Sequence, residues 1–135
     1  MAFMQWREAY SVSVARLDNQ HKHLIGMING LHEVMLAGGK QDHLQAVLED
    51  LLTYTQSHFA DEEKAMAQAG YPKLAAHQQK HRAMQAEVKR LLELARTEQT
   101  TVSIKLMTFL KDWLTKHICQ TDHEYAPALT AAHIQ

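Results

Sequence analysis

The sequence predicts an all-α fold, an up-down-up-down four-helix bundle preceded by an N-terminal arm. Apolar residues recur at steps of three and four in four segments, the pattern of a helix with one buried face. Glycine and proline are scarce, 5 and 2 among 135 residues, and several of them lie between these segments. Because the connections are short, consecutive helices are expected to be antiparallel neighbours.

The first two helices are predicted from stripes in the first half of the chain. Asp18 is the expected N-cap of the first helix, and Gly38 is expected to follow its C-terminal end. The second helix is expected to fade before Gly70. The inward positions are Leu17, His21, Leu24, Ile28, Leu31 and Met35 in the first helix, and Leu44, Leu48, Leu51, Thr55, His58 and Glu62 in the second.

The third and fourth helices follow the same pattern. Pro72 is expected to open the third helix, where its missing N–H is tolerated. A polar turn at residues 97–101 separates the third helix from the fourth. The inward positions are Leu74, His77, His81, Met84, Val88, Leu91 and Ala95 in the third helix, and Leu106, Leu110, Trp113 and His117 in the fourth.

The length suits a single domain over residues 1–135. Within it we expect an arm (1–17), the bundle (18–122) and a C-terminal tail (123–135). The formal charge is −1, without runs of like charge, which excludes recognition of nucleic acid or an anionic membrane by charge. The first residues lack the features of a signal peptide, and no stretch approaches the ~18 apolar residues of a membrane span. A cytoplasmic protein without disulfides is therefore expected.

Ionisable residues occupy positions that the stripes assign to the interior. These residues are His21, His58, Glu62, His77, His81 and His117. Buried ionisable groups are costly unless they are paired or bind a metal. As an alternative, these histidines could be structural and hydrogen-bonded to protein groups. That alternative does not explain why all six positions also lie at one level of an up-down-up-down bundle. A metal site is therefore predicted. Asp122 can join it only if the fourth helix ends or bulges after His117, because five residues span about 140° on an ideal helix.

The number of donors predicts two metal ions. Five imidazoles and two bridging carboxylates supply about nine donors, and a single-atom bridge raises the total to about eleven of the twelve positions in two octahedra. One position then stays open for a small exogenous molecule. Nitrogen and oxygen donors without thiolate favour iron, with manganese second. Imidazole in place of carboxylate favours holding dioxygen over splitting it.

The motifs around these residues resemble those of the hemerythrins, most closely the single-domain bacteriohemerythrins. They are LDNQHKHL with His21, HFADEE with His58 and Glu62, HQQKH with His77 and His81, and HICQTD with His117 and Asp122. The resemblance covers nearly the whole chain. It implies a cofactor of two iron ions (Fe2+/Fe3+) with an oxo or hydroxo bridge, and reversible dioxygen binding for oxygen transport, storage or delivery.

The resemblance also implies a role for each ligand. His77, His81 and His117 would bind the six-coordinate iron. His21 and His58 would bind the iron with the open position, and the two carboxylates, Glu62 and Asp122, would bridge.

An apolar oxygen pocket and two tyrosines beside the site are further implications of the resemblance. The pocket residues would be Leu24, Phe59, Trp113, Leu114 and Ile118, which would exclude water from the open position. On spacing alone these residues fit equally well as ordinary core. The tyrosines Tyr71 and Tyr125 would donate hydrogen bonds near the metal ligands, although a half-buried tyrosine at a helix end needs no such role.

The remaining histidines and the cysteine are expected to take no part in metal binding. Cys119 should point away from the site, because it lies about 200° from His117 on a continuous helix. The histidines expected in solvent are His23, His32, His43, His123 and His133.

Three classes of function stay open at this point. A non-enzymatic dioxygen carrier or store is favoured, expected as a monomer that supplies an oxygen-consuming enzyme or a redox partner. The second class is an oxygen or redox sensor that acts through a partner protein. The third is a di-iron enzyme that consumes peroxide or nitric oxide.

Overall fold

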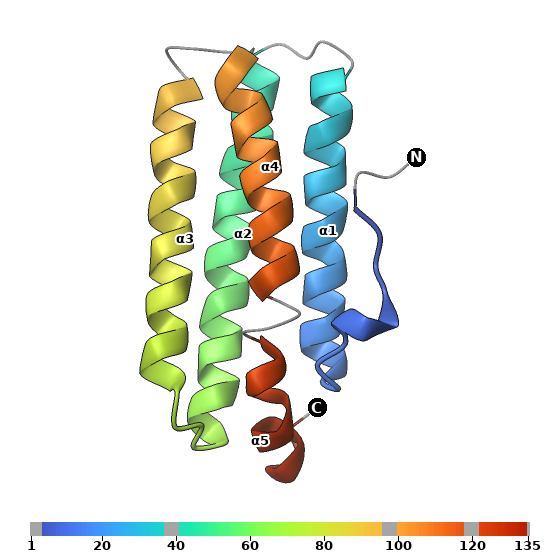
Figure 1. The fold of residues 1–135 in the computed structure, drawn as a ribbon, viewed down its shortest axis with the longest axis vertical. Coiled ribbons are helices and arrows are strands. Elements are labelled where there is room, and N and C mark those ends of the chain that lie inside the picture. The colour runs from blue at the N-terminus through green and yellow to red at the C-terminus, as the bar shows by residue number, and fades with distance from the viewer. Residues whose placement is uncertain (1–3, 37–40, 96–99, 118–121, 135) are drawn as a thin grey trace.

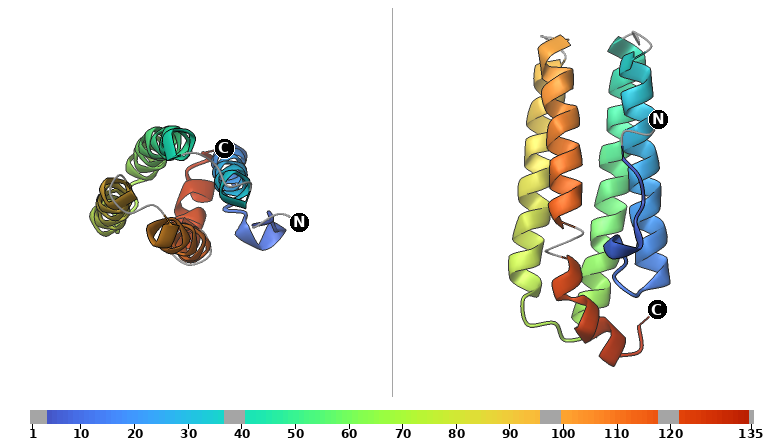
Figure 2. Two further views of the ribbon diagram at one scale, coloured as in Figure 1. Left: turned by 90° about the horizontal axis from the view of Figure 1, so that it is seen from above. Right: turned by 45° about the vertical axis from the view of Figure 1, so that its right-hand side comes forward.

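A computed structural model describes residues 4–36, 41–95, 100–117 and 122–134. Four long helices run alternately up and down (Figure 1), and the view from above shows them around a common axis (Figure 2). α1 and α3 each pack against both α2 and α4, which confirms the predicted all-α, up-down-up-down bundle. The elements are η1 (Glu8–Tyr10), α1 (Ala15–Leu36), α2 (Gln41–Gln68), α3 (Leu74–Ala95), α4 (Thr100–Lys116), η3 (Asp122–Glu124) and α5 (Ala126–Ala131).

Gly70 ends α2 as the sequence predicts. Its φ of +67° lies in the left-handed region that glycine adopts without a steric penalty. The N–H of Tyr71 bonds the carbonyl of Met66, and the N–H of Gly70 bonds the carbonyl of Ala67, at 3.0 and 3.1 Å. This pair of bonds is a Schellman motif, which satisfies carbonyls left open at the end of α2.

Two predicted helix starts are wrong by a few residues. α1 begins at Ala15 rather than after Asp18. Asp18 is not an N-cap, because its carboxylate accepts hydrogen bonds from the Ser11 hydroxyl and the Val12 N–H in the preceding segment. Pro72 precedes α3, which begins at Leu74.

The N-terminal segment lies along the outside of α1 (Figure 1). The Asn29 side-chain amide accepts from the N–H of Met4 and donates to its carbonyl, at 2.7 and 2.8 Å. The Trp6 ring packs edge-on against Tyr10, and the Lys22 ammonium lies 5.0 Å from the centre of the Trp6 ring.

The described core has two apolar parts, one on each side of the level of His21. The larger part begins in α1 at Leu24 and fills the bundle toward the α1–α2 connection. The smaller part includes Leu17 of α1, Met66 of α2 and Leu129 of α5, and closes the opposite end. The polar interior lies between these parts, where solvent is excluded from both directions. None of the described helices is both long and apolar enough to cross a membrane.

Candidate metal centre

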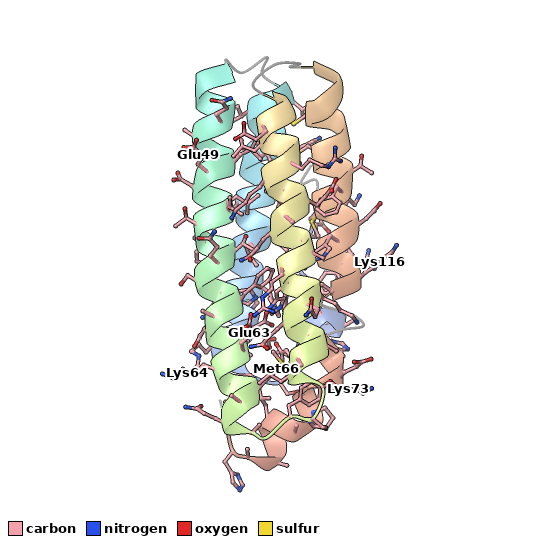
Figure 3. The ribbon with its side chains drawn as sticks, turned by 90° about the vertical axis from the view of Figure 1, so that its left-hand side faces the viewer. Glu49, Glu63, Lys64, Met66, Lys73 and Lys116 are labelled. Atoms are coloured by element: carbon pink, nitrogen blue, oxygen red, sulfur yellow. The ribbon has the colours of Figure 1, made fainter. Side chains whose placement is uncertain are left out.

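Side chains from α1, α2 and α3, from the residue that directly follows α4, and from η3 meet inside the bundle at one level. Figure 3 shows nitrogen and oxygen atoms gathered between the helices near Glu63. Each of these side chains is at most 4% exposed, so the protein buries a set of ionisable groups at considerable cost. They are His21, His58, Glu62, His77, His81, His117 and Asp122.

Asp122 faces three imidazoles. Its Oδ1 lies 3.0 Å from His77 Nε2 and 2.9 Å from His117 Nε2, and its Oδ2 lies 3.1 Å from His21 Nε2. Asp122 can reach them because the α-helix of α4 ends at Lys116, one residue before the expected end after His117, and η3 places Asp122 in the interior.

Glu62 lies between two groups of possible ligands. Its Oε1 is 3.1 Å from His58 Nε2 and 3.4 Å from His81 Nε2, and its Oε2 is 3.4 Å from His21 Nε2. Within each group the candidate ligand atoms lie within 4.8 Å of one another. Glu62 belongs to both groups. The smaller group is His21, His58 and Glu62. The larger group is Glu62, His77, His81, His117 and Asp122.

Two of the imidazoles are oriented through their other ring nitrogen. His81 Nδ1 lies 2.9 Å from the carboxylate of Glu63, and His58 Nδ1 lies 2.6 Å from the side-chain oxygen of Gln20. Since these oxygens only accept, each Nδ1 carries a proton, and each Nε2 faces the interior as the nitrogen that could bind a metal ion. A metal-binding histidine has this arrangement.

The inward-facing atoms are poorly satisfied by protein partners, which fits a cation between them. His81 Nε2 and His117 Nε2 share a hydrogen bond of 3.0 Å, in which one nitrogen donates and the other accepts. Buried polar atoms rarely lack partners in native proteins. Among the described residues, several buried atoms have short contacts that lack hydrogen-bond geometry, and they include His21 Nε2, His77 Nε2, Glu62 Oε1 and both carboxylate oxygens of Asp122.

The electrostatics of the centre also favour a cation. Burial raises the pKa of Glu62, but His58 and the other facing imidazoles lower it well below its usual value. The pKa of Asp122 is lowered too, because His117 and His21 outweigh burial and the neighbouring Glu62. Burial lowers the pKa of His21, yet the two carboxylates raise it to about 10. Two ionised carboxylates in a dry interior bind cations strongly.

The two predicted tyrosines differ in their contacts. Tyr125 is fully buried and donates a 2.6 Å hydrogen bond to Glu62 Oε2. Burial and the nearby carboxylates raise its pKa well above the usual value, so the hydroxyl keeps its proton. The pKa of Tyr71 is raised by burial and by Glu124, and its hydroxyl bonds Glu124.

A small cavity, lined by residues one helical turn from the candidate ligands, has room for roughly one water-sized molecule. Three predicted pocket residues line it, and its other lining residues are also apolar except for Thr55. The Thr55 hydroxyl bonds the carbonyl of Leu51 at 2.6 Å. The lining is Leu24, Ile28, Leu51, Thr55, Met84, Leu110, Trp113 and Leu114.

Two other predicted pocket residues do not line this cavity in the described structure. Phe59 stacks on the His81 ring, with centroids 3.7 Å apart and planes within 2°. Ile118 lies outside the described residues, as does Cys119. Trp113 lines the cavity and also stacks on His117, at 4.3 Å and 14°.

The histidines predicted in solvent are only partly so. His23 and His133 are exposed, whereas His32 and His123 are half-buried. The Nε2 of His123 is buried without a partner among the described residues. The prediction of solvated side chains is therefore wrong for His32 and His123, and the His43 side chain lies outside the described part.

Gln20 and Glu63 belong to the centre but were not predicted from the sequence. Each adjoins a ligand candidate, Gln20 before His21 and Glu63 after Glu62. Neighbours on a helix point about 100° apart, so both leave the inward stripe and face the adjacent helix. A polar residue at a helix–helix boundary beside a ligand is the signal that could have identified them.

The chain is similar to known proteins along nearly its whole length. The family model "Hemerythrin HHE cation binding domain" matches residues 12–129. The bacteriohemerythrin of Stenotrophomonas maltophilia is 35% identical over 97% of this chain and 84% of its own length. That of Methylococcus capsulatus is 32% identical over 97% of this chain and 100% of its own.

Solved structures agree with this similarity. A wild-type hemerythrin crystal structure is 32% identical and superposes with a TM-score of 0.86, covering 96% of this chain and 99% of that one. With the buried, metal-competent cluster in the same fold, the chain belongs to the hemerythrin family.

Proposed function

We propose that this protein binds dioxygen reversibly at a centre of two iron ions inside the bundle. The observation that carries the proposal is the buried cluster of inward-facing imidazole nitrogens and two carboxylates, one helical turn from residues that line an apolar cavity. The proposed ligands are His21, His58, Glu62, His77, His81, His117 and Asp122.

The two groups of ligand atoms suggest a division of roles. The group with three imidazoles would hold one ion with His77, His81 and His117. The group with fewer donors would hold the ion that has an open position, through His21 and His58. Glu62 is shared by both groups, and Asp122 faces imidazoles of both, so both carboxylates suit bridging positions. Two iron ions bound there would supply the electrons that dioxygen accepts on binding and returns on release.

The protein contributes a dry environment around this centre. Leu24, Trp113 and Leu114 lie within one helical turn of His21 and His117 and line the cavity. They would admit a small apolar molecule and keep water and anions from the open position.

We propose carriage or storage of dioxygen rather than its enzymatic reduction. Thr55 provides the one hydroxyl in the cavity lining, and that hydroxyl already donates to the Leu51 carbonyl. It is therefore not positioned to give a proton to a bound ligand. We further propose that the protein is a cytoplasmic monomer that supplies dioxygen to an oxygen-consuming enzyme or a redox partner. Cell fractionation would test the location, and native mass measurement would test the monomeric state.

The test is a cycle of oxygenation and release. The iron-loaded, anaerobically reduced protein is exposed to air and then to vacuum while visible absorption is recorded. An absorption band that appears and disappears over repeated cycles supports the proposal. Steady consumption of dioxygen with an added reductant, without a reversible band, would identify an oxidase instead.

A further inference from the structure

The orientation of His58 depends on a chain of side chains that reaches the surface. His58 Nδ1 lies 2.6 Å from Gln20 Oε1, and Gln20 Nε2 lies 2.7 Å from Asp61 Oδ2. The same Asp61 oxygen lies 3.0 Å from Arg16 Nε. The chain alternates between α1 and α2, and its outer pair is partly exposed, with Arg16 at 46% and Asp61 at 29%.

Each link of this chain fixes the direction of the next. The Asp61 carboxylate can only accept, so the Gln20 amide must turn its nitrogen toward Asp61. The Gln20 oxygen then faces His58 and accepts the proton of Nδ1. With Nδ1 donating to Gln20, the Nε2 of His58 faces the centre, 3.1 Å from Glu62 Oε1, as the nitrogen available to a metal ion.

We propose that Gln20 is a positioning residue for the metal centre, and that Asp61 sets the orientation in which its amide holds His58. The inference rests on the proposed function only in taking His58 as an iron ligand. It extends that function by naming what keeps this imidazole in its metal-binding form.

His81 shows why the chain needs Asp61. His81 Nδ1 is held directly by the Glu63 carboxylate at 2.9 Å, and a carboxylate can only accept hydrogen bonds. The Gln20 amide can present either its oxygen or its nitrogen, so it has to be oriented from outside. His58 also belongs to the group with fewer donors, where the loss of one ligand matters most.

The first experiment measures iron loss to an external ferrous chelator. In Gln20→Leu we expect one of the two ions to leave about 10- to 100-fold faster, because losing a group that orients a ligand typically lowers metal affinity by that factor. The other ion should keep the wild-type rate. Gln56→Leu is the matched control, because it makes the same change at an exposed position of the helix that carries His58. Equal acceleration of both ions, or no difference between Gln20→Leu and the control, would overturn the proposal.

A charge exchange gives a second test that does not depend on how well Gln20→Leu folds. Gln20→Glu alone places two carboxylates at the 2.7 Å contact, so one iron should be released faster. Adding Asp61→Asn restores a donor at position 61 and leaves the new carboxylate at position 20 free to accept from His58. The double variant should therefore return to the wild-type rate. A double variant that releases iron as fast as Gln20→Glu contradicts the proposal, because shape and total charge are unchanged from wild type.

The design separates this inference from the proposed function. Wild-type protein that holds two irons without reversible oxygenation refutes dioxygen carriage but leaves the iron-release comparison intact. Wild-type oxygenation with no selective iron loss in either test refutes the role of Gln20 alone. A gradient of release rates, with Gln20→Leu above Asp61→Ala and Asp61→Ala above Arg16→Ala, would support the chain link by link.

Discussion

Tyr125→Phe should destabilise the iron-free protein by more than any other removal of a single tyrosine hydroxyl in the described part of the chain. The Tyr125 hydroxyl donates a 2.6 Å hydrogen bond to Glu62, and both side chains are fully buried. Phenylalanine keeps the ring and its packing against Leu129 and Met66. The change therefore isolates the hydrogen bond and leaves one oxygen of an ionised, buried carboxylate without its donor.

The magnitude follows from the charge and the burial of the pair. A hydrogen bond to a charged group contributes about 1.5–3 kcal/mol. Unfolding entropy is roughly 2.1 cal/mol/K per residue, so 135 residues give about 0.28 kcal/mol/K. One kcal/mol then corresponds to about 3.5 °C, and the expected fall in Tm is about 5–11 °C.

The assay is thermal unfolding of the iron-free variant, followed by far-ultraviolet circular dichroism at fixed pH and salt. Tyr54→Phe is the control, because Tyr54 is half-buried on α2 and packs on the ring of exposed His23. Its expected effect is within about 0.5 kcal/mol, or about 2 °C. Equal Tm values for Tyr125→Phe and Tyr54→Phe would show that the Tyr125–Glu62 bond adds nothing, and the reasoning would fail.

Further predictions concern the cavity, the ligands and a turn. Leu114→Ala should speed decay of the oxygenated form in stopped-flow measurements by admitting water. Leu31→Ala, at a buried residue that does not line the cavity, should lose about 2–5 kcal/mol of stability without faster decay. His58→Ala should lower bound iron below two ions per chain by metal analysis; full occupancy would remove His58 from the ligand set. Gly70→Ala should destabilise the protein by about 1–2 kcal/mol because Gly70 has a positive φ. Gly26→Ala, in open space on α1, should stabilise it by about 0.5–1 kcal/mol. Chemical denaturation measures both free energies of unfolding, and changes of the same sign would contradict the argument.

Much of this structure follows from periodicity, which reports the direction of each side chain. Leu17, His21 and Leu24 share one face of α1, so their burial follows from their spacing in the sequence alone. The gathering of the ionisable residues follows from the same stripes together with bundle topology. Their role as iron ligands stays a prediction, which metal analysis of the His58 variant would test.

The features that could not be predicted depend on tertiary partners. Asp18 has the chemistry of an N-cap, but Ser11 and Val12 fold back onto its carboxylate and the helix begins earlier. His123 lies off the stripes, yet η3 carries it partly inside. Gln20 looks like an ordinary surface residue of α1 until α2 brings His58 and Asp61 to its two ends.

The contact between Asp122 and His21 also has a consequence for the order of folding. These residues lie about 100 positions apart, near opposite ends of the chain, and their side chains approach to 3.1 Å. An ion held by both closes a loop of about 100 residues, for which a covalent cross-link is calculated to stabilise by about 4.7 kcal/mol through chain entropy. Such an ion would therefore cross-link the first and last parts of the domain. The complete site cannot exist until synthesis has passed Asp122, so full metal loading follows assembly of the whole bundle.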